Sequence, residues 1–467
     1  MADIFVIDDQ HPEDLAMLQA LYSRSPASVV THLEKLKQTG SGKFMDNYYV
    51  GYGHASIGDC GATTVFIEQV SMLVAKAVQD NPLYNGQEAS TRYLDFSKQA
   101  IIDPYNNPAS TAIQNRWMEI YNAVLSKLVA ALEQQRPFDP TQYRSEKGWR
   151  NTLQARAFDI ARSLLPLGTT TLLSWSTTLR QARDNLRRLK HHPLPEVREV
   201  ARNIFTSITA KYPHSFKGDE MQDEAPTPRD TYTQKFASRD HFLAPEEATR
   251  RFGLTPAEDR QLRAGDIIAR RNAIDIDSMK RLEGETLSTR PANVPLPWRL
   301  ESYGRYQLLF LLDYGSFRDI QRHRNGYCSI PLVDGRYGMH PWCRQQFIDL
   351  LSPADAESLL RDIDAQYAAI AALAQKGVPV TPELNQYLYP MGTSALIQVT
   401  YSVPEVAYVG ELRSGKTVHP SLRPIAQNML RILAADLPGI ALHGDMDEDD
   451  WSAKRGEQTI TGKEKAA

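Results

Sequence analysis

The stretch RSLLPLGTT at residues 162–170 recurs loosely as QYLYPMGTS at residues 386–394. Further along, five identities continue at one gapless offset of about 225 residues, within segments that both have the pattern of an amphipathic helix ending before a proline. They pair Arg198, Ala201, Asn203, Ala210 and Pro213 with Arg423, Ala426, Asn428, Ala435 and Pro438. Any two amphipathic helices share some resemblance, but a single register across five positions favours an internal duplication.

The two halves also show the same order of expected elements. A helical segment is followed by a β-prone run, a long helix, a second β-prone run and terminal helices. These segments are 13–37, 63–68, 111–134 and 172–175 in the first half, and 256–281, 306–312, 353–375 and 396–401 in the second. The mixture predicts an α/β or α+β fold made of two tandem copies that form an intramolecular pseudo-dimer. We expect halves at 1–216 and 236–445, a polar linker at 217–235, and a disordered tail at 446–467.

The composition is that of an ordinary globular protein, with 42% hydrophobic and 23% charged residues among 467. A formal net charge of -3 provides no global attraction for nucleic acid or an anionic membrane, so any anion site must be local. The start of the chain lacks a signal-peptide pattern, and no apolar run reaches the roughly 20 residues of a membrane span. Three scattered cysteines predict neither a disulfide framework nor a metal site. We expect a cytoplasmic protein.

Two short motifs contain side chains suited to binding a ligand. Arg-His-Arg at residues 322–324 sets two guanidinium groups beside an imidazole, which is a concentrated donor set for phosphate oxygens. The sequence QEASTRY at residues 87–93 places a carboxylate, a hydroxyl and a guanidinium at alternate positions, Glu88, Ser90 and Arg92. Such a polar edge suits a base or a sugar. One motif lies in each half, and together they predict a single composite site.

These motifs resemble the signature of the flavin-dependent thymidylate synthases, in which R-H-R is followed by seven residues, then a serine, and shortly after by R-Y. The second half keeps R-H-R at 322–324 but has Leu332 at the serine position. The first half keeps Ser90 and the R-Y pair but has Asp-Asn-Pro at 80–82 in place of R-H-R. Each half therefore retains the part of the signature that the other lacks.

The same division extends to other family positions. The arginine before the turn proline is Arg162 in the first half and Gln386 in the second. The late L-R pair survives as Leu412-Arg413, and a flavin-side H-x-S element survives as His54 and Ser56. In the family, one subunit supplies the E-x-S-x-R segment and the early arginine, and another subunit supplies R-H-R and the late arginine. The resemblance thus implies one nucleotide site per chain, shared between the halves. Because the family is homotetrameric, it also implies a homodimer that forms a pseudo-tetramer.

The resemblance implies an enzyme, a methyltransferase that carries out reductive methylation of dUMP at C5. Methylenetetrahydrofolate would provide the carbon, reduced FAD the hydride, and NADPH the electrons that regenerate the flavin. By the same resemblance Ser90 and Arg413 act in catalysis, Ser90 by positioning or polarisation rather than by covalent attack. Substrate contacts would come from Gln87, Glu88, Arg92, Arg162 and Arg322, and cofactor contacts from His54, Ser56, Arg322, His323 and Arg324.

One departure from the family leaves two alternatives open. The family has a glutamine three residues before R-H-R, whereas this chain has Asp319, an acceptor-only anion. A flavoenzyme that modifies a different pyrimidine nucleotide is therefore an alternative. The other is a non-catalytic nucleotide- or nucleic-acid-binding protein on the same scaffold.

Overall fold

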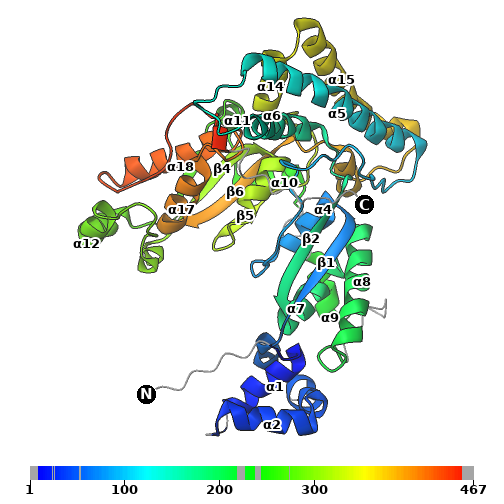
Figure 1. Cartoon of the computed structure of the whole chain (residues 1–467), viewed down its shortest axis with the longest axis vertical. Helices are drawn as coiled ribbons and strands as arrows, with labels where there is room; N and C mark the ends of the chain where they lie inside the picture. The colour runs from blue at the N-terminus through cyan, green and yellow to red at the C-terminus, as the bar shows by residue number, and fades with distance from the viewer. Residues whose placement is uncertain are drawn as a thin grey trace. The chain divides into compact units, whose positions relative to one another are not determined.

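The computed structural model describes residues 9–23, 25, 27–51, 54–217, 227–236, 243–272 and 274–454. The chain forms two compact units (Figure 1). Unit 1 contains residues 1–88 and 171–240, and unit 2 contains residues 89–170 and 241–467. Residues 89–170, from the first half of the sequence, therefore fold together with the second half.

Unit 1 combines short helices with a two-stranded sheet, β1-β2. Ser71 and Thr178 each end a strand and accept a hydrogen bond from the backbone of the helix that follows, which is why a helix begins directly after each strand. Its elements are α1 (Pro12–Tyr22), α2 (Val29–Thr39), α3 (Gly42–Phe44), η1 (Met45–Gly51), η2 (Ala55–Cys60), β1 (Ala62–Ser71), α4 (Met72–Gln79), β2 (Thr170–Thr178), α7 (Leu179–Leu189), α8 (Pro195–Lys211) and α9 (Pro228–Lys235).

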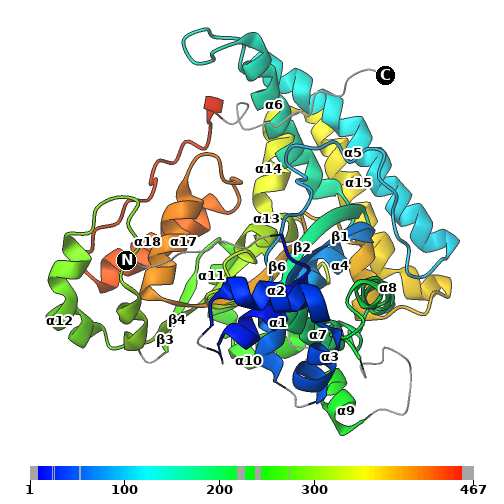
Figure 2. The ribbon, with the colours of Figure 1, turned by 60° about the horizontal axis from the view of Figure 1, so that its bottom comes forward.

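Unit 2 is built on an antiparallel sheet in the order β3-β4-β6-β5. Helices α5 and α15 lie side by side, and α17 packs with α18 (Figures 1 and 2). The helices are α5 (Pro108–Gln135), α6 (Glu146–Ala161), η3 (Arg162–Leu164), α10 (Pro245–Phe252), α11 (Pro256–Arg263), α12 (Ile276–Ser288), η5 (Trp298–Tyr303), α13 (Tyr314–Ile320), α14 (Pro341–Leu350), α15 (Pro353–Ala371), η6 (Leu373–Lys376), α16 (Pro382–Asn385), η7 (Gln386–Leu388), α17 (Val403–Ser414) and α18 (Arg423–Asp436). The strands are β3 (Ile268–Asn272), β4 (Arg305–Asp313), β5 (Tyr327–Ser329) and β6 (Ser394–Ser402).

Both faces of the central strands in unit 2 are buried. One face of β4 and β6 packs through Leu309 and Leu396 against Phe252 of α10 and Leu262 of α11. The intervening residues of β4, such as Phe310, are fully buried on the other face. Strands buried on both sides read as nearly continuous apolar runs, which is the pattern of the sequence at 306–312.

The turns at residues 162–170 and 386–394 meet inside unit 2 and bond to each other reciprocally. Leu167 N donates to Tyr389 O at 2.9 Å, and Met391 N donates to Leu165 O at 2.8 Å. Gly168 N donates to Tyr387 O at 3.0 Å, and Gly392 N donates to Ser163 O at 2.8 Å. Pro166 and Pro390 form an antiparallel bridge at the centre. Positions at the same offset in the two turns therefore exchange matching bonds, as they would about a local two-fold axis.

The fold is mixed helix and strand, of the α+β kind, and the four expected strands are present as β1, β2, β4 and β6. The helical segment expected at residues 256–281 is interrupted by a strand. Gly265, with φ of 92°, lies between α11 and strand β3, whose backbone pairs with β4. Helix α12 starts only at Ile276, where Asp275 caps it.

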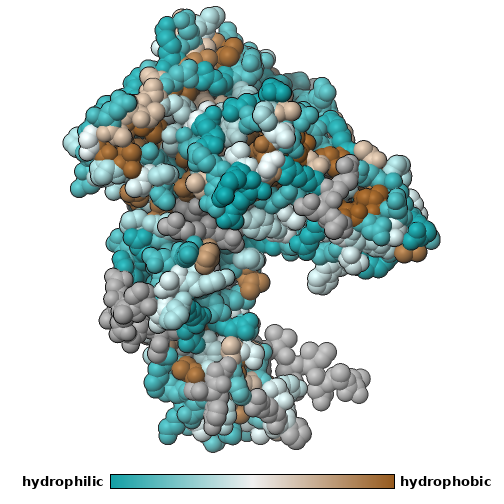
Figure 3. All heavy atoms as spheres, turned by 180° about the vertical axis from the view of Figure 1, so that it is seen from behind, coloured by the Kyte–Doolittle hydropathy of each residue, from teal (hydrophilic) through white to brown (hydrophobic). Residues whose placement is uncertain are grey.

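The C-terminal segment also differs from the expected disordered tail. Residues 446–454 run along unit 2, where Arg156 bonds to Asp450 and Thr152 Oγ1 donates to Ala453 O at 3.0 Å. The remainder of the expected tail, 455–467, lies outside the described residues, as do 218–226 of the expected linker, while 228–235 form α9. In the part of the chain that is described, no helix is long and apolar enough to cross a membrane. Hydrophobic side chains reach the face seen in Figure 3 as separate patches among hydrophilic ones.

Candidate functional site

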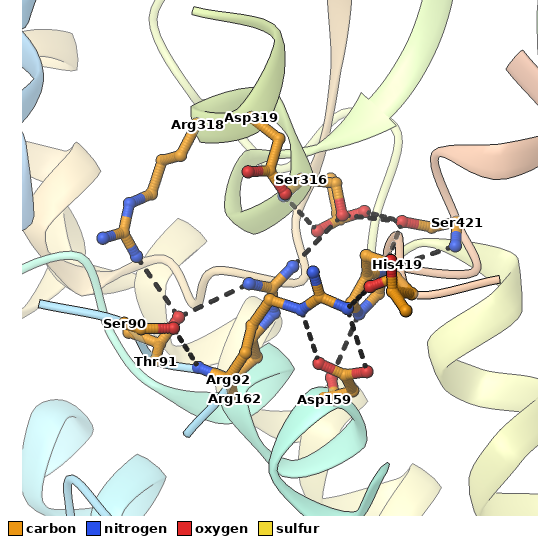
Figure 4. Close-up of polar contacts among 12 residues, drawn as sticks. Ser90, Thr91, Arg92, Asp159, Arg162, Ser316, Arg318, Asp319, His419 and Ser421 are labelled. Carbon is orange, nitrogen blue, oxygen red and sulfur yellow. Dashed lines mark hydrogen bonds and ion pairs between the residues drawn. The ribbon is translucent and has the colours of Figure 1, made fainter. Parts of the chain in front are cut away.

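The candidate site lies within unit 2, where the segment 89–92 meets helix α13. Arg318 of α13 donates from Nη1 to Thr91 Oγ1 at 3.2 Å and from Nη2 to Ala89 O at 3.1 Å. Arg162, at the start of η3, reaches the same Thr91 hydroxyl at 3.4 Å through Nη1 (Figure 4). Two buried guanidinium groups therefore converge on one neutral oxygen atom. Burial lowers the pKa of Arg162 to about 10, so it remains charged at neutral pH.

Arg92 is held beside this pair by a carboxylate. Its Nε donates to Asp159 Oδ1 at 2.9 Å, and its Nη2 donates to the backbone oxygen of Thr417 at 3.0 Å. Burial acts to lower the pKa of Arg92, but the adjacent Asp159 carboxylate outweighs it and raises that pKa above its ordinary value. Asp159 is fully buried near the end of α6, so it fixes the guanidinium in one position.

A chain of hydroxyl groups supports Arg162 from the other side. Arg162 Nη2 donates to Ser316 Oγ at 3.2 Å, and Ser316 Oγ lies 2.8 Å from Ser421 Oγ. Ser421 in turn bonds to the Asp313 carboxylate and to His419 Nδ1 (Figure 4). Burial lowers the pKa of His419 far below its ordinary value, so the imidazole is neutral. This network belongs to β4, α13 and the segment before α18.

Asp319, on the last turn of α13, is surrounded by arginine side chains. Its carboxylate lies 3.7 Å from Arg413 Nη1 and 3.8 Å from Arg322 Nη1. Burial acts to raise the pKa of Asp319, but Arg413, Arg92 and the neighbouring arginines lower it to about 2. Within the described part of the chain, the carboxylate makes ion pairs at these longer distances and no hydrogen bond. Its oxygens are therefore available as acceptors.

The Arg-His-Arg motif continues from the end of α13 to the sheet. Arg413 of α17 donates from Nε to His323 Nε2 at 2.9 Å and from Nη2 to Asp319 O at 2.9 Å. Burial and the Arg413 charge lower the pKa of His323 to about 3, so this imidazole is neutral and carries its proton on Nδ1. The exposed ring of Tyr408 lies edge-on to it, with centroids 5.9 Å apart. The Arg322 side chain is 46% exposed and can reach a ligand from solvent.

The charge of this arginine cluster decides what it can bind. We define the cluster as Arg92, Arg162, Arg318, Arg322 and Arg413. Three carboxylates stand among them, those of Asp159, Asp313 and Asp319. Five positive charges against three negative charges leave two positive charges, which matches a phosphate dianion. The described residues hold no group of three or more side chains that could ligate a metal.

The structure brings together most of the residues predicted from the sequence. Arg92, Arg162 and Arg413 surround Asp319 closely enough to shift its pKa, as does Arg322. Ser90 adjoins this group, is half-buried, and its hydroxyl accepts a bond from the Arg92 backbone at 3.4 Å. The motif residues His323 and Arg324 follow directly, and Arg324 Nη1 donates to Arg322 O at 3.2 Å.

The other predicted residues belong to unit 1. Gln79 donates to the Glu88 carboxylate at 2.7 Å, and the backbone of Gln87 pairs with Ser174 of β2. His54 is half-buried before η2, and Ser56 is exposed within it. These four residues therefore belong to unit 1, whereas the arginines and Ser90 belong to unit 2.

Several residues of the site were not predicted. Arg318 lies on α13, four residues before Arg322 of the motif. A helical pattern would place residues at that spacing on one side, and this spacing could have revealed Arg318. Asp159 lies three residues before Arg162 and could have been noted in the same way. The serine–histidine network around Ser421 has no such local signal, because its partners come from distant segments.

Comparison with known proteins matches the chain to one family and to several relatives. Residues 6–214 match the family described as thymidylate synthase complementing protein. Along nearly its full length the chain is similar to proteins named UPF0159. It is 26% identical to one from Chlamydia muridarum, over 83% of this chain and 77% of the relative. It is 24% identical to one from Thermoplasma acidophilum, over 92% of this chain and 94% of the relative.

Proposed function

We propose, from the match of residues 6–214 to the thymidylate synthase complementing family, that the chain is an enzyme acting on a pyrimidine nucleotide. The proposed reaction is the FAD-dependent methylation of dUMP at C5, with methylenetetrahydrofolate as carbon donor and NADPH as reductant. The nucleotide phosphate binds the arginine cluster. The observation that carries the proposal is the gathering of five arginines, four of them largely buried, around Thr91, Asp159 and Asp319.

The cluster draws on both halves of the sequence, which supports a composite site. Arg92 and Arg162 come from the first half, and Arg318, Arg322 and Arg413 come from the second. The reciprocal bonds between the turns at Pro166 and Pro390 support the tandem duplication. We propose that the chain is a pseudo-dimer with one working site, and that two chains form a homodimer.

The residues around Arg-His-Arg suit a flavin. His323 is neutral, and the exposed Tyr408 ring beside it offers an aromatic surface of the kind on which a planar ring system can pack. Arg322 and Arg324 would meet the cofactor's phosphates. When bound, FAD supplies the hydride chemistry, and the protein contributes binding, orientation and charge. Arg413, fixed by His323 and Asp319, would stabilise negative charge that develops on the pyrimidine. Ser90 would position the nucleotide.

Asp319 favours a second candidate substrate. An ionised carboxylate can only accept hydrogen bonds, and this one has none in the described structure apart from its longer ion pairs. It would repel the carbonyl oxygens of uracil and would attract an amino group. The second candidate is therefore a flavoenzyme acting on a pyrimidine nucleotide that carries a hydrogen-bond donor at that edge.

The test begins with purification of the full chain and measurement of its flavin absorbance. Reduced protein is then mixed with dUMP and methylenetetrahydrofolate, and flavin oxidation and dTMP formation are followed. Substrate-dependent oxidation with dTMP as product is expected for dUMP; oxidation only with an amino-pyrimidine nucleotide would select the second candidate. A protein that binds nucleotide without any flavin would refute both enzyme proposals and identify a non-catalytic binding protein.

Two variants test the composite site. Ser90→Ala and Arg322→Ala should each abolish turnover, because the two residues lie on segments from different halves. Arg361→Ala is the matched control, since Arg361 is 70% exposed on α15 and pairs with Glu357. Normal activity in either site variant would refute the shared site.

A further inference from the structure

The sheet of unit 1 has an exposed face whose counterpart in unit 2 is covered. Phe66 on β1 is 75% exposed and Leu172 on β2 is 51% exposed, although both sit in β-strands. In unit 2, Leu309 and Leu396 are buried under α10 and α11. Exposed large apolar side chains in a strand mark a surface that normally has a partner.

Phe66 and Leu172 are the counterparts of Leu309 and Leu396, as strand ends and caps show. Strands β2 and β6 both have nine residues and end at a helix cap, Thr178 or Ser402, which aligns Leu172 with Leu396. Strand β1 has one residue more than β4, and Gln69, with φ of 58°, accommodates it. Counting from the strand starts therefore aligns Phe66 with Leu309.

An independent contact supports this alignment. Thr64 Oγ1 on β1 lies 3.1 Å from Ser176 Oγ on β2. By the same counting these residues correspond to Gln307 and Thr400, which are direct partners in the unit 2 sheet. This contact fits the same pairing of the two central strands in both units.

The outer edge of β1 in unit 1 also differs from that of its counterpart β4 in unit 2. In unit 2 the edge of β4 pairs with β3 along residues 305–309. In unit 1, β2 is the sole neighbour of β1 among the residues that the structure describes. Strand β1 contains no proline or lysine, the residues that commonly protect an open edge. Its backbone donors and acceptors can therefore pair with another strand.

We propose that β1 is the surface through which two copies of this chain associate, by antiparallel pairing of β1 with β1 of the second copy. The inference rests on the duplication proposed above and adds the surface for the proposed homodimer. An antiparallel edge is self-complementary about a two-fold axis, so one strand serves both copies. With the axis at Phe66, the two Phe66 rings face each other.

The charges of β1 fit this arrangement. Glu68 is its one charged residue, and pairing centred on Phe66 sets each Glu68 opposite Thr64 of the other copy rather than opposite its own counterpart. Since β3 already occupies the equivalent edge of β4 in unit 2, the described part of each chain offers this β1-type edge once. A single isologous edge closes a dimer and does not continue into a filament.

The experiment measures the mass of the full chain by light scattering over a dilution series, without nucleotide or flavin. The wild-type chain is expected to be a dimer. Phe66→Lys places like charges opposite each other and should weaken association by about 100-fold. Leu282→Lys is the matched control, because Leu282 is 65% exposed on α12 of unit 2, and it should stay dimeric. A monomeric wild type, or a Phe66→Lys variant that is as dimeric as the wild type, would overturn the proposal.

A cross-link tests the register. Phe66→Cys places two thiols directly opposite each other, at a Cβ separation near that of a disulfide, and should give an interchain disulfide under mild oxidation. Thr64→Cys should not, because the two introduced thiols would lie about four residues, or ~13 Å, apart along the paired strands. Cross-linking in both or in neither would contradict pairing centred on Phe66. These experiments measure association in the absence of nucleotide and flavin. A negative result would therefore overturn the β1 contact without bearing on the proposed nucleotide site.

Discussion

Arg318 donates a hydrogen bond to the hydroxyl oxygen of Thr91 at 3.2 Å, joining two residues more than two hundred positions apart in the chain. Arg162 donates to the same oxygen. A hydroxyl oxygen is a neutral acceptor, so this contact brings two guanidinium groups together without adding a negative charge. This junction, more than any single motif, makes the cluster a candidate phosphate site.

Replacement of Arg318 should weaken nucleotide binding. One charge-assisted hydrogen bond contributes about 1.5–3 kcal/mol, so Arg318→Ala should raise the Kd for the nucleotide by about 10- to 150-fold. Titration calorimetry with dUMP and with uridine, which lacks the phosphate, measures this. The loss should be confined to dUMP, because the proposed contact is to phosphate.

Arg116→Ala is the control for that measurement. Arg116 also sits in unit 2, but on the exposed side of α5, where it pairs with Glu119 and Asp362. Its removal should leave the affinity unchanged. Equal losses for dUMP and uridine in the Arg318 variant would show that Arg318 acts on the structure of the site instead of on the phosphate.

Asp159→Asn should destabilise unit 2 and misplace Arg92. Asp159 is fully buried and is paired to Arg92 at 2.9 Å, so the substitution leaves a largely buried guanidinium without its counter-ion. Breaking such a pair typically costs about 3–5 kcal/mol. The thermal unfolding midpoint is the measurement. Glu146→Gln, which removes an exposed pairing with Arg150, is the control and should leave the midpoint nearly unchanged. An unchanged midpoint for Asp159→Asn would contradict a structural role for the pair.

The sequence allowed prediction of those parts of the fold and site that depend on local pattern. The apolar run at 306–312 and the long amphipathic segment at 111–134 are close to β4 and α5. Strand β3 was missed because it is short and is stabilised by pairing with β4, a partner distant in sequence.

The site residues also fall into those with a local sequence pattern and those that depend on distant segments. Arg322 and Arg413 could be predicted because each lies in a recognisable motif. Arg318, Asp159 and Ser421 could not, since their roles depend on which segments meet in three dimensions. Residues 89–170 fold with the second half, and periodicity along the chain carries no information about that exchange.

The stability of the protein should fall between pH 7 and pH 5 because of His323. Burial and Arg413 lower its folded pKa to about 3, whereas an unfolded histidine has a pKa of about 6.5. The unfolded state therefore binds a proton in this window that the folded state does not, so stability is present above pH 6.5 and is lost as pH falls. The expected loss at pH 5 is about 2 kcal/mol from this residue.

His323→Gln tests the assignment, since glutamine can accept the Arg413 bond and does not titrate. Urea unfolding at pH 7 and at pH 5 should show a smaller loss in the variant. His214→Gln is the control, because His214 is 40% exposed. An identical loss in the His323 variant and the wild type would contradict the assignment.

Truncation after Gly444 should destabilise unit 2, because backbone oxygens of residues 445–453 accept hydrogen bonds from buried side chains. Arg423 is almost fully buried, and its Nη1 and Nη2 donate to the backbone oxygens of Asp449 and Asp447 at 3.0 and 2.9 Å. Trp451 packs beneath the guanidinium of Arg136 at 4.1 Å. Without the segment, Arg423 loses two acceptors, and each unsatisfied buried donor costs about 1–3 kcal/mol. The midpoint of thermal unfolding should fall by several degrees. Truncation after Lys454 keeps every one of these contacts and is the matched control. Equal midpoints for the two truncations would show that the contacts contribute nothing to stability.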